Sequence, residues 1–187
     1  MSATENTEFH GEGDSAGWRR LISEIQTLAT ELNSHCGTDS NRVGLPASAD
    51  NLRRLGKEIG LAPTHPLLRM YVLADGLSLM DCFNGLAIHP VERVVAGASD
   101  GYVPRVIGDL SCVCFGSTGG GDLFCFRGNS SEVVRLTEIA VENGKANLES
   151  WQVRTVARDL SEFLFRVCDD LSACLQNREG HEYLSSP

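Results

Sequence analysis

No apolar run in this 187-residue chain is long enough to cross a bilayer, because charged side chains interrupt each run before it reaches about 18 residues. The first 17 residues also lack a basic segment followed by an apolar one, and they are too acidic for a transit peptide. These absences predict a protein with a cytoplasmic location and no membrane partner.

Positive charge is scarce relative to negative charge. Lysine and arginine number 16 against 25 aspartates and glutamates, which gives a formal net charge of −9. An acidic surface repels phosphate backbones, so direct binding of nucleic acid is not expected. The charge favours encounter with a basic protein partner, although many acidic surfaces serve solubility alone.

Cysteines are present, but they form neither a disulfide framework nor a Cys-x-x-Cys metal knuckle. Most of the seven lie inside apolar segments, where reduced thiols pack as small hydrophobic side chains. Cys112, Cys114 and Cys125 could converge with a histidine such as His89 on zinc, but a second half-site is missing. We therefore expect packed thiols, no metal and no other cofactor.

Helical patterns dominate the first part of the chain. Residues 1–16 carry few apolar side chains and are predicted to form a mobile acidic tail. Apolar residues at helical spacing then predict an amphipathic helix over Trp18–Cys36. A second helix is predicted to follow Ser48 as its cap and to end at Gly60, and a third to end before Gly76.

From about residue 77 short apolar runs alternate with turn residues, which is typical of an antiparallel meander. The runs are Leu86 to His89 and then VPRVI, LSCVCFG, DLFCFRG and EVVRL, with a short helix predicted over Val91 to Ala98. Four glycines are predicted to form structural turns in and around this region: Gly76, Gly85, Gly116 and Gly121.

The last predicted element is a long helix. Apolar residues at helical spacing extend from Val153 to Leu175, with Ser150 as candidate cap and residues 178–187 as a frayed tail. Helices on either side of a run of strands predict an α+β fold. We expect a curved antiparallel sheet of about five to six strands, flanked by N-terminal helices and a long C-terminal helix, in one domain over residues 17–177.

The segment GSTGGGD, from Gly116 to Asp122, has the glycines of a phosphate-binding loop but lacks its lysine. Apolar runs flank it on both sides, so a tight hairpin turn is favoured over nucleotide binding. In the predicted hairpin Phe115 lies opposite Phe124 and Cys114 opposite Cys125, which gives one aromatic face and one thiol-bearing face.

Catalytic patterns are also lacking. The string Gly97 to Gly101 matches Gly-x-Ser-x-Gly, but no strand precedes its serine and a proline follows it closely, so a plain turn is predicted. The five histidines are scattered, and no cysteine has an obvious base. We therefore predict no catalytic residue.

Aspartates beside glycines or at element ends are the candidates for contact with a partner, because loops on a rigid sheet commonly carry recognition. They are Asp75, Asp81, Asp100, Asp109 and Asp122.

Several segments together resemble the SUKH superfamily, which includes cell-wall synthesis regulators and bacterial immunity proteins. LRMYVLADGLSL (Leu68–Leu79) is similar to its helix, Asp-Gly and strand segment, and GSTGGGDLFCF with VVRL (Gly116–Leu136) to its glycine-aspartate strand pair. VARDLSEFL (Val156–Leu164) resembles its closing helix, and Leu52–Pro63 fits the helix upstream. The resemblance covers roughly residues 48–170.

The resemblance implies a non-enzymatic protein-binding module, in the form of an immunity protein that binds and neutralises a toxin such as a basic nuclease or deaminase. A regulatory scaffold of the same fold, binding an endogenous protein, is the first alternative. A small nucleotide-binding enzyme using Gly116 to Asp122 is the second. The sequence leaves monomer and dimer open.

Overall fold

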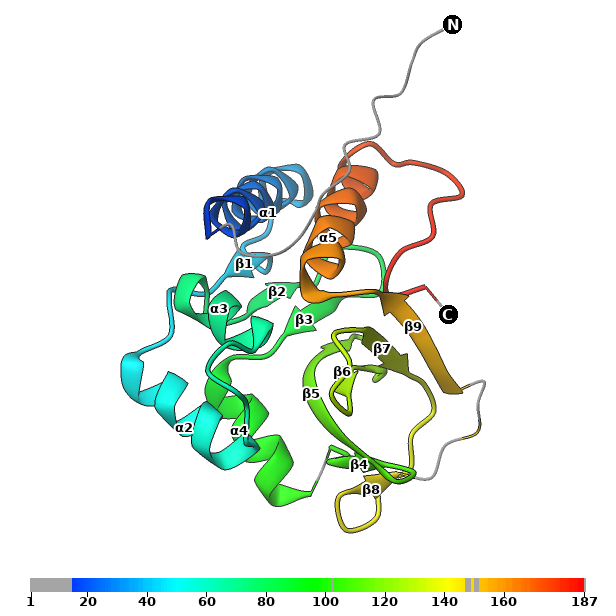
Figure 1. The fold of residues 1–187 in the computed structure, drawn as a ribbon. Helices are drawn as coiled ribbons and strands as arrows, with labels where there is room; N and C mark the ends of the chain where they lie inside the picture. The colour runs from blue at the N-terminus through cyan, green and yellow to red at the C-terminus, as the bar shows by residue number, and fades with distance from the viewer. Residues whose placement is uncertain (1–14, 102, 147–148, 150–151, 187) are drawn as a thin grey trace, which may run out of the picture.

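A computed structural model of the chain describes residues 15–101, 103–146, 149 and 152–186. Within these residues five helices and nine strands form an α+β fold with an open sheet, which confirms the predicted class (Figure 1). The predicted tail lies outside the described residues, except for Ser15 and Ala16, which belong to the first helix. The predicted cap Ser150 also lies outside the described residues. No helix in the described ranges is both long and apolar enough to cross a membrane.

The three helices predicted before the sheet are confirmed, and local capping explains where they begin and end. The Ser48 hydroxyl accepts a hydrogen bond from the Asn51 amide at 3.2 Å, and Gly60 closes the same helix with a φ of +79°. His65 caps the third helix, because its side chain accepts a hydrogen bond from the Leu67 amide. The helices are α1 (Ser15–Cys36), α2 (Ala49–Ile59) and α3 (Pro66–Leu73).

The sheet follows the order β1-β2-β3-β5-β6-β7-β9, and every pair along this path is antiparallel. Off the path, β4 pairs antiparallel with β5 and parallel with β8. The two-residue strands β1, β4 and β8 account for most of the difference from the predicted number. The strands are β1 (Arg42–Val43), β2 (Leu77–Leu79), β3 (Leu86–Ile88), β4 (Val106–Ile107), β5 (Leu110–Thr118), β6 (Leu123–Arg127), β7 (Val133–Leu136), β8 (Lys145–Ala146) and β9 (Val153–Ala157).

The hairpin of β5 and β6 has the predicted register at Cys114 and Cys125, which lie opposite each other. The register then shifts by one residue, so Phe124 pairs with Gly116 and not with Phe115 as predicted. The bulge lies where β5 crosses close to β3: a Cβ on Gly116 would lie 2.6 Å from the Ala87 carbonyl oxygen. Glycine allows this close approach of the two strands.

The predicted separation of aromatic and thiol side chains onto two faces is confirmed. Phe115, Phe124 and Phe126 lie in the large hydrophobic core beneath the helices. The thiols belong to a smaller cluster on the other face, which contains Ile107, Cys112, Cys114, Cys125, Val134 and Leu136. In Figure 1, α1 and α5 (Leu160–Leu175) lie side by side at one end of the molecule, and β4 and β8 lie at the opposite end.

The predicted helix from Val153 is wrong over its first residues. Residues Val153–Ala157 form β9 and pair with β7, whereas α5 spans Leu160–Leu175. Val153 and Val156 fit a helical repeat, but β-branched side chains also favour a strand, and an available sheet edge decides between the two. The Asp159 carboxylate caps α5 by accepting a hydrogen bond from the Glu162 amide at 2.8 Å.

The chain beyond Asn177 is packed against the fold, which contradicts the predicted frayed tail. Leu184 is only 4% exposed, and its amide donates to the Asp170 carboxylate at 2.9 Å. The Tyr183 ring stacks on Phe83 with 4.7 Å between ring centroids. These contacts join residues 178–186 to α5 and to the β2–β3 turn.

Candidate functional site

Three of the five aspartates predicted to contact a partner are used within the fold. The Asp75 carboxylate accepts a hydrogen bond from the Val91 amide at 2.7 Å and so caps α4 (Val91–Asp100). Asp81 accepts hydrogen bonds from three side chains of the α1–β1 loop, those of Ser40, Thr38 and Asn41, and these bonds lower the pKa of its carboxyl group. Asp122 forms an ion pair with a buried arginine, Arg135.

Asp100 and Asp109 remain exposed at the end of the molecule formed by α4, β4 and β8. The α4 terminus at Gly101 lies against Gly144 of the hairpin that contains Glu142. Within the described residues the carboxylates of Asp100, Asp109 and Glu142 form no ion pair, and all three are exposed. We call these three carboxylates the acidic end.

The surroundings of the acidic end combine apolar and charged groups. Leu110, which follows Asp109 at the start of β5, is 48% exposed. Arg105 and Lys145 are exposed nearby on the paired strands. Backbone hydrogen bonds from Arg105 to Gly144 and from Gly108 to Ala146 hold the two segments together. The acidic end therefore lies on a fixed framework.

The glycine-rich segment forms a hairpin turn, as the sequence predicts. Strand β6 follows directly after Asp122, so the segment does not lead into a helix N-terminus. The Gly119 amide donates to the Asn84 carbonyl at 2.9 Å, and the Asp122 amide donates to the Thr118 hydroxyl at 3.2 Å. These amides are already bonded within the protein and are not available to cradle a phosphate.

The other singled-out glycines lie in turns, inside a strand or at the end of a helix. Gly76, Gly85 and Gly121 have φ values of +83°, +71° and +94°, as expected for turns. Gly116 was predicted in the same group but lies inside β5, where its small size permits the approach of β3. The Gly-x-Ser-x-Gly string falls at the end of α4, where Gly101 terminates the helix with a φ of +73°.

The three cysteines of the smaller cluster are held as protonated thiols. Cys112 and Cys114 both donate to the Pro104 carbonyl, at 2.9 and 3.5 Å. The pKa of Cys125 is raised by its complete burial. The His89 amide donates a hydrogen bond to the carbonyl of Phe115 on β5 at 2.8 Å. Among the described residues no group of three or more His, Cys, Asp or Glu side chains is arranged to hold a metal ion.

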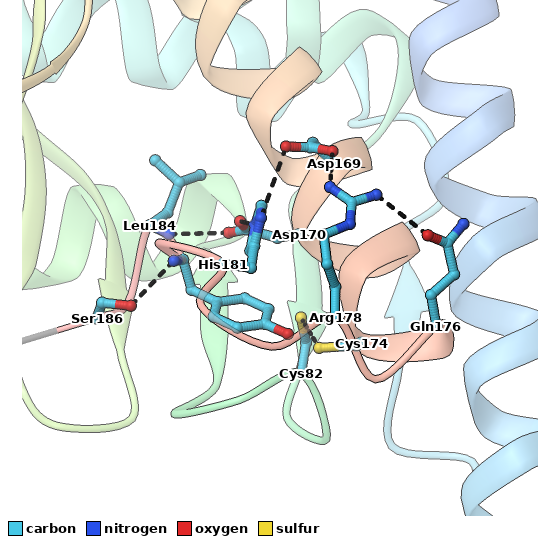
Figure 2. A network of polar contacts seen from close by, with 10 residues as sticks. Cys82, Asp169, Asp170, Cys174, Gln176, Arg178, His181, Leu184 and Ser186 are labelled. Carbon is cyan, nitrogen blue, oxygen red and sulfur yellow. Dashed lines mark hydrogen bonds and ion pairs between the residues drawn. The ribbon is translucent and has the colours of Figure 1, made fainter.

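A second polar region, not predicted from the sequence, surrounds the docked C-terminal segment (Figure 2). Asp170 on α5 is 5% exposed and pairs with the His181 Nε2 atom at 2.8 Å. The neighbouring Asp169 pairs with Arg178 at 3.0 Å. We call the side chains that fasten residues 178–186 to the fold the tail network.

Arg135 of β7 joins Asp122, at the end of the glycine-rich turn, to the tail network. Its guanidinium group is buried, donates through two nitrogens to the Asp122 carboxylate, and also donates to the carbonyls of Leu184 and Ser186. A planar group with several donors suits such a junction. A cavity of about 230 Å³ lies beside it, lined by cationic and anionic side chains, including Arg154 and Glu182, which pair with each other.

Two cysteines lie at one edge of the tail network. The Cys82 Sγ atom, in the β2–β3 turn, is 2.8 Å from the Cys174 Sγ atom in the last turn of α5. Hydrogen bonds from the Cys82 thiol, the Tyr183 hydroxyl and the Phe83 amide lower the pKa of Cys174 to about 7, against the opposing effect of burial. The pKa of Cys82 is raised by its bond to Cys174 and by burial.

The half-buried His89 is expected to make the free energy of unfolding sensitive to acid. Burial, and to a lesser extent the charge of Arg93, lower its pKa from 6.5 to about 4. The unfolded chain therefore binds the proton more readily than the folded chain. The stability that depends on neutral His89 is fully present above pH 6.5 and is lost as the pH falls towards 4. We expect this group to remove roughly 1–2 kcal/mol of unfolding free energy between pH 7 and pH 5.

The measurement is urea unfolding at several pH values for the parent and for His89→Gln. Between pH 7 and pH 5 the free energy of unfolding of the parent should fall by roughly 1–2 kcal/mol more than that of His89→Gln. His35→Gln, at the exposed end of α1, is the control and should follow the parent at every pH. Parallel pH curves for the parent and His89→Gln would contradict the prediction.

The tail network was missed because its members are far apart in the sequence. Cys82 and Cys174 are 92 residues apart and follow no spacing rule. Asp170 does have a local signal in the sequence, since it lies between Val167 and Leu171 on the apolar face of α5. Comparison of the chain with protein-family models and with curated proteins found no match.

Proposed function

We propose that the chain is a non-enzymatic protein-binding module that docks a basic protein through the acidic end. The observation that carries the proposal is the contrast among the five predicted aspartates. Asp75, Asp81 and Asp122 are bonded within the fold, whereas Asp100, Asp109 and Glu142 are exposed and form no ion pair with any described residue. Exposed carboxylates on a fixed framework steer a positively charged partner into contact.

The apolar side chain at this end supports docking rather than solubility alone. Interfaces commonly have an apolar centre surrounded by a polar rim. Leu110 supplies an exposed apolar contact next to Asp109. A basic partner would place its cations on the rim and bury Leu110.

The resemblance of the quoted segments to the SUKH superfamily supports a more specific role. Under this role the partner is a toxin, such as a nuclease or deaminase, which must be cationic to bind nucleic acid. The protein would neutralise it by covering that cationic surface. A regulatory scaffold that binds an endogenous basic protein uses the same surface and differs in the identity of the partner.

The test uses the protein encoded immediately upstream of this gene as the binding probe. Association and dissociation rates are measured at low and high salt for the parent and for the triple variant Asp100→Lys, Asp109→Lys, Glu142→Lys. We expect the association rate of the variant to fall by about tenfold or more, because electrostatic steering contributes on the order of 10- to 1,000-fold. The salt dependence of the rate should fall with it.

The matched control reverses three exposed carboxylates elsewhere, in Glu24→Lys, Glu31→Lys, Asp39→Lys on α1 and the loop after it. It changes the net charge equally and should associate nearly as fast as the parent. Equal rates for both triple variants would contradict docking at the acidic end. Failure of the parent to protect cells that express the upstream protein would contradict the immunity role.

A further inference from the structure

We propose that Cys82 and Cys174 are a redox-active thiol pair that a hydroperoxide converts into a disulfide, with Cys174 as the attacking thiol and Cys82 as the resolving thiol. The proposal is independent of the acidic end and of any protein partner. It concerns two sulfur atoms that the fold brings together from the β2–β3 turn and the end of α5 (Figure 2).

The geometry places the two sulfurs in position for bond formation. Their separation of 2.8 Å is shorter than an ordinary non-bonded contact, and a disulfide bond needs about 2.05 Å. Both sulfurs lie at element ends, Cys82 in the turn after β2 and Cys174 in the last turn of α5, where small backbone movements are possible. The segment 178–186 folds over them and holds the turn against the helix.

The two thiols are unequal in a way that assigns their roles. Cys174 is half-buried and accepts hydrogen bonds from the Cys82 thiol, the Tyr183 hydroxyl and the Phe83 amide, all of which stabilise a thiolate. Burial raises the pKa of Tyr183 to about 12, with a further contribution from its bond to Cys174, so the hydroxyl remains a donor at neutral pH. Cys82 is 4% exposed, and its hydrogen bond with Cys174, together with its burial, raises its pKa and keeps it protonated.

The chemistry has two steps. In the first, the Cys174 thiolate attacks the terminal oxygen of the hydroperoxide, an S–O bond forms, the O–O bond breaks, and the alkoxide leaves with a solvent proton as an alcohol. The sulfur is oxidised by two electrons to a sulfenic acid. In the second, the Cys82 sulfur attacks the Cys174 sulfur, an S–S bond forms, and hydroxide leaves with the Cys82 proton as water. One hydroperoxide is reduced for each disulfide formed.

The experiment treats the full chain with a small excess of hydrogen peroxide, blocks remaining thiols and maps tryptic peptides without reduction. We expect residues 70–93, which contain Cys82 alone, to be linked to residues 167–178, which contain Cys168 and Cys174. Fragmentation of the linked peptide should assign the bond to Cys174. The initial rate should rise about tenfold from pH 6 to pH 8 and then level off, because the thiolate titrates near neutral pH.

Two variants separate the roles of the thiols. In Cys82→Ser the serine hydroxyl replaces the thiol donor, so Cys174 should still react and a sulfenic acid should be trapped there by dimedone. In Cys174→Ser the buried Cys82 should stay reduced under the same treatment. Cys168→Ser is the matched control on the same peptide and should form the linkage at the parental rate.

Oxidation of the exposed Cys36 without linkage of the two peptides would overturn the proposal. Equal reactivity of Cys82 in the parent and in Cys174→Ser would overturn the assigned roles. Reduction of the linked protein with dithiothreitol should restore both thiols, which distinguishes the disulfide from irreversible oxidation.

Discussion

Replacing Arg135 with methionine is expected to lower the unfolding free energy by about 3–5 kcal/mol, the usual cost of removing one partner of a buried ion pair. The guanidinium group is the shared donor for the Asp122 carboxylate and for the carbonyls of Leu184 and Ser186. Methionine fills similar volume but leaves these acceptors without their donor. Urea unfolding followed by circular dichroism measures the change by linear extrapolation.

Arg154→Met is the matched control for this prediction. Arg154 also joins β9 to the C-terminal segment, through Glu182, but its side chain is 54% exposed and that of its partner 67%. Exposed ion pairs contribute about 0–1 kcal/mol, so the control should lose little stability. Limited trypsin cleavage after Arg178 gives a second readout, since Arg135→Met should release this segment and speed the cut. Equal losses in the two variants would contradict the role assigned to Arg135.

Replacing Gly76 with alanine is expected to cost about 2–5 kcal/mol, from two effects that add. The residue has a φ of +83°, which strains any residue with a side chain. Its Cβ atom would also lie 2.5 Å from the Ile88 carbonyl oxygen and 2.9 Å from the Pro90 nitrogen. Both obstacles are backbone atoms, so the turn before β2 would have to move away from the end of β3.

Gly121→Ala separates the two effects, because Gly121 has a similar φ of +94° but no atom within 4 Å of its Cβ position. It should show the cost of backbone strain alone, about 1–2 kcal/mol. The excess loss in Gly76→Ala then measures the close approach of β2 and β3. Chemical denaturation of both variants under one condition supplies the comparison, and equal losses would show that the approach is not tight.

The elements that the sequence predicted well are those whose signals are local. Ser48 and Gly60 mark the two ends of α2 through hydrogen bonds and a left-handed φ that involve neighbouring residues only. The hairpin of β5 and β6 was likewise predicted from its turn and its alternating side chains. Its bulge was not, because the bulge depends on Ala87 of a different strand approaching Gly116.

The errors arise where distant parts of the chain decide the structure. Val153 and Val156 fit both a helix and a strand, and only the presence of the β7 edge selects the strand. The segment after Asn177 is polar, and its composition alone predicts a frayed tail. Arg135 and Asp170 nevertheless hydrogen-bond to the carbonyl and the amide of Leu184. The predicted aspartates were correctly found at element ends, but sequence position does not tell which carboxylates meet an internal donor.

The pairing of α1 with α5 has a consequence for synthesis of the protein. The apolar stripe of α1, which includes Ile25 and Leu32, packs more extensively on α5 than on β1 or α3. A ribosome that adds about 5–20 residues per second needs roughly 7–28 seconds between completing α1 and completing α5. During that interval the stripe lacks its main cover, which makes it a target for chaperones that capture exposed apolar helices on nascent chains.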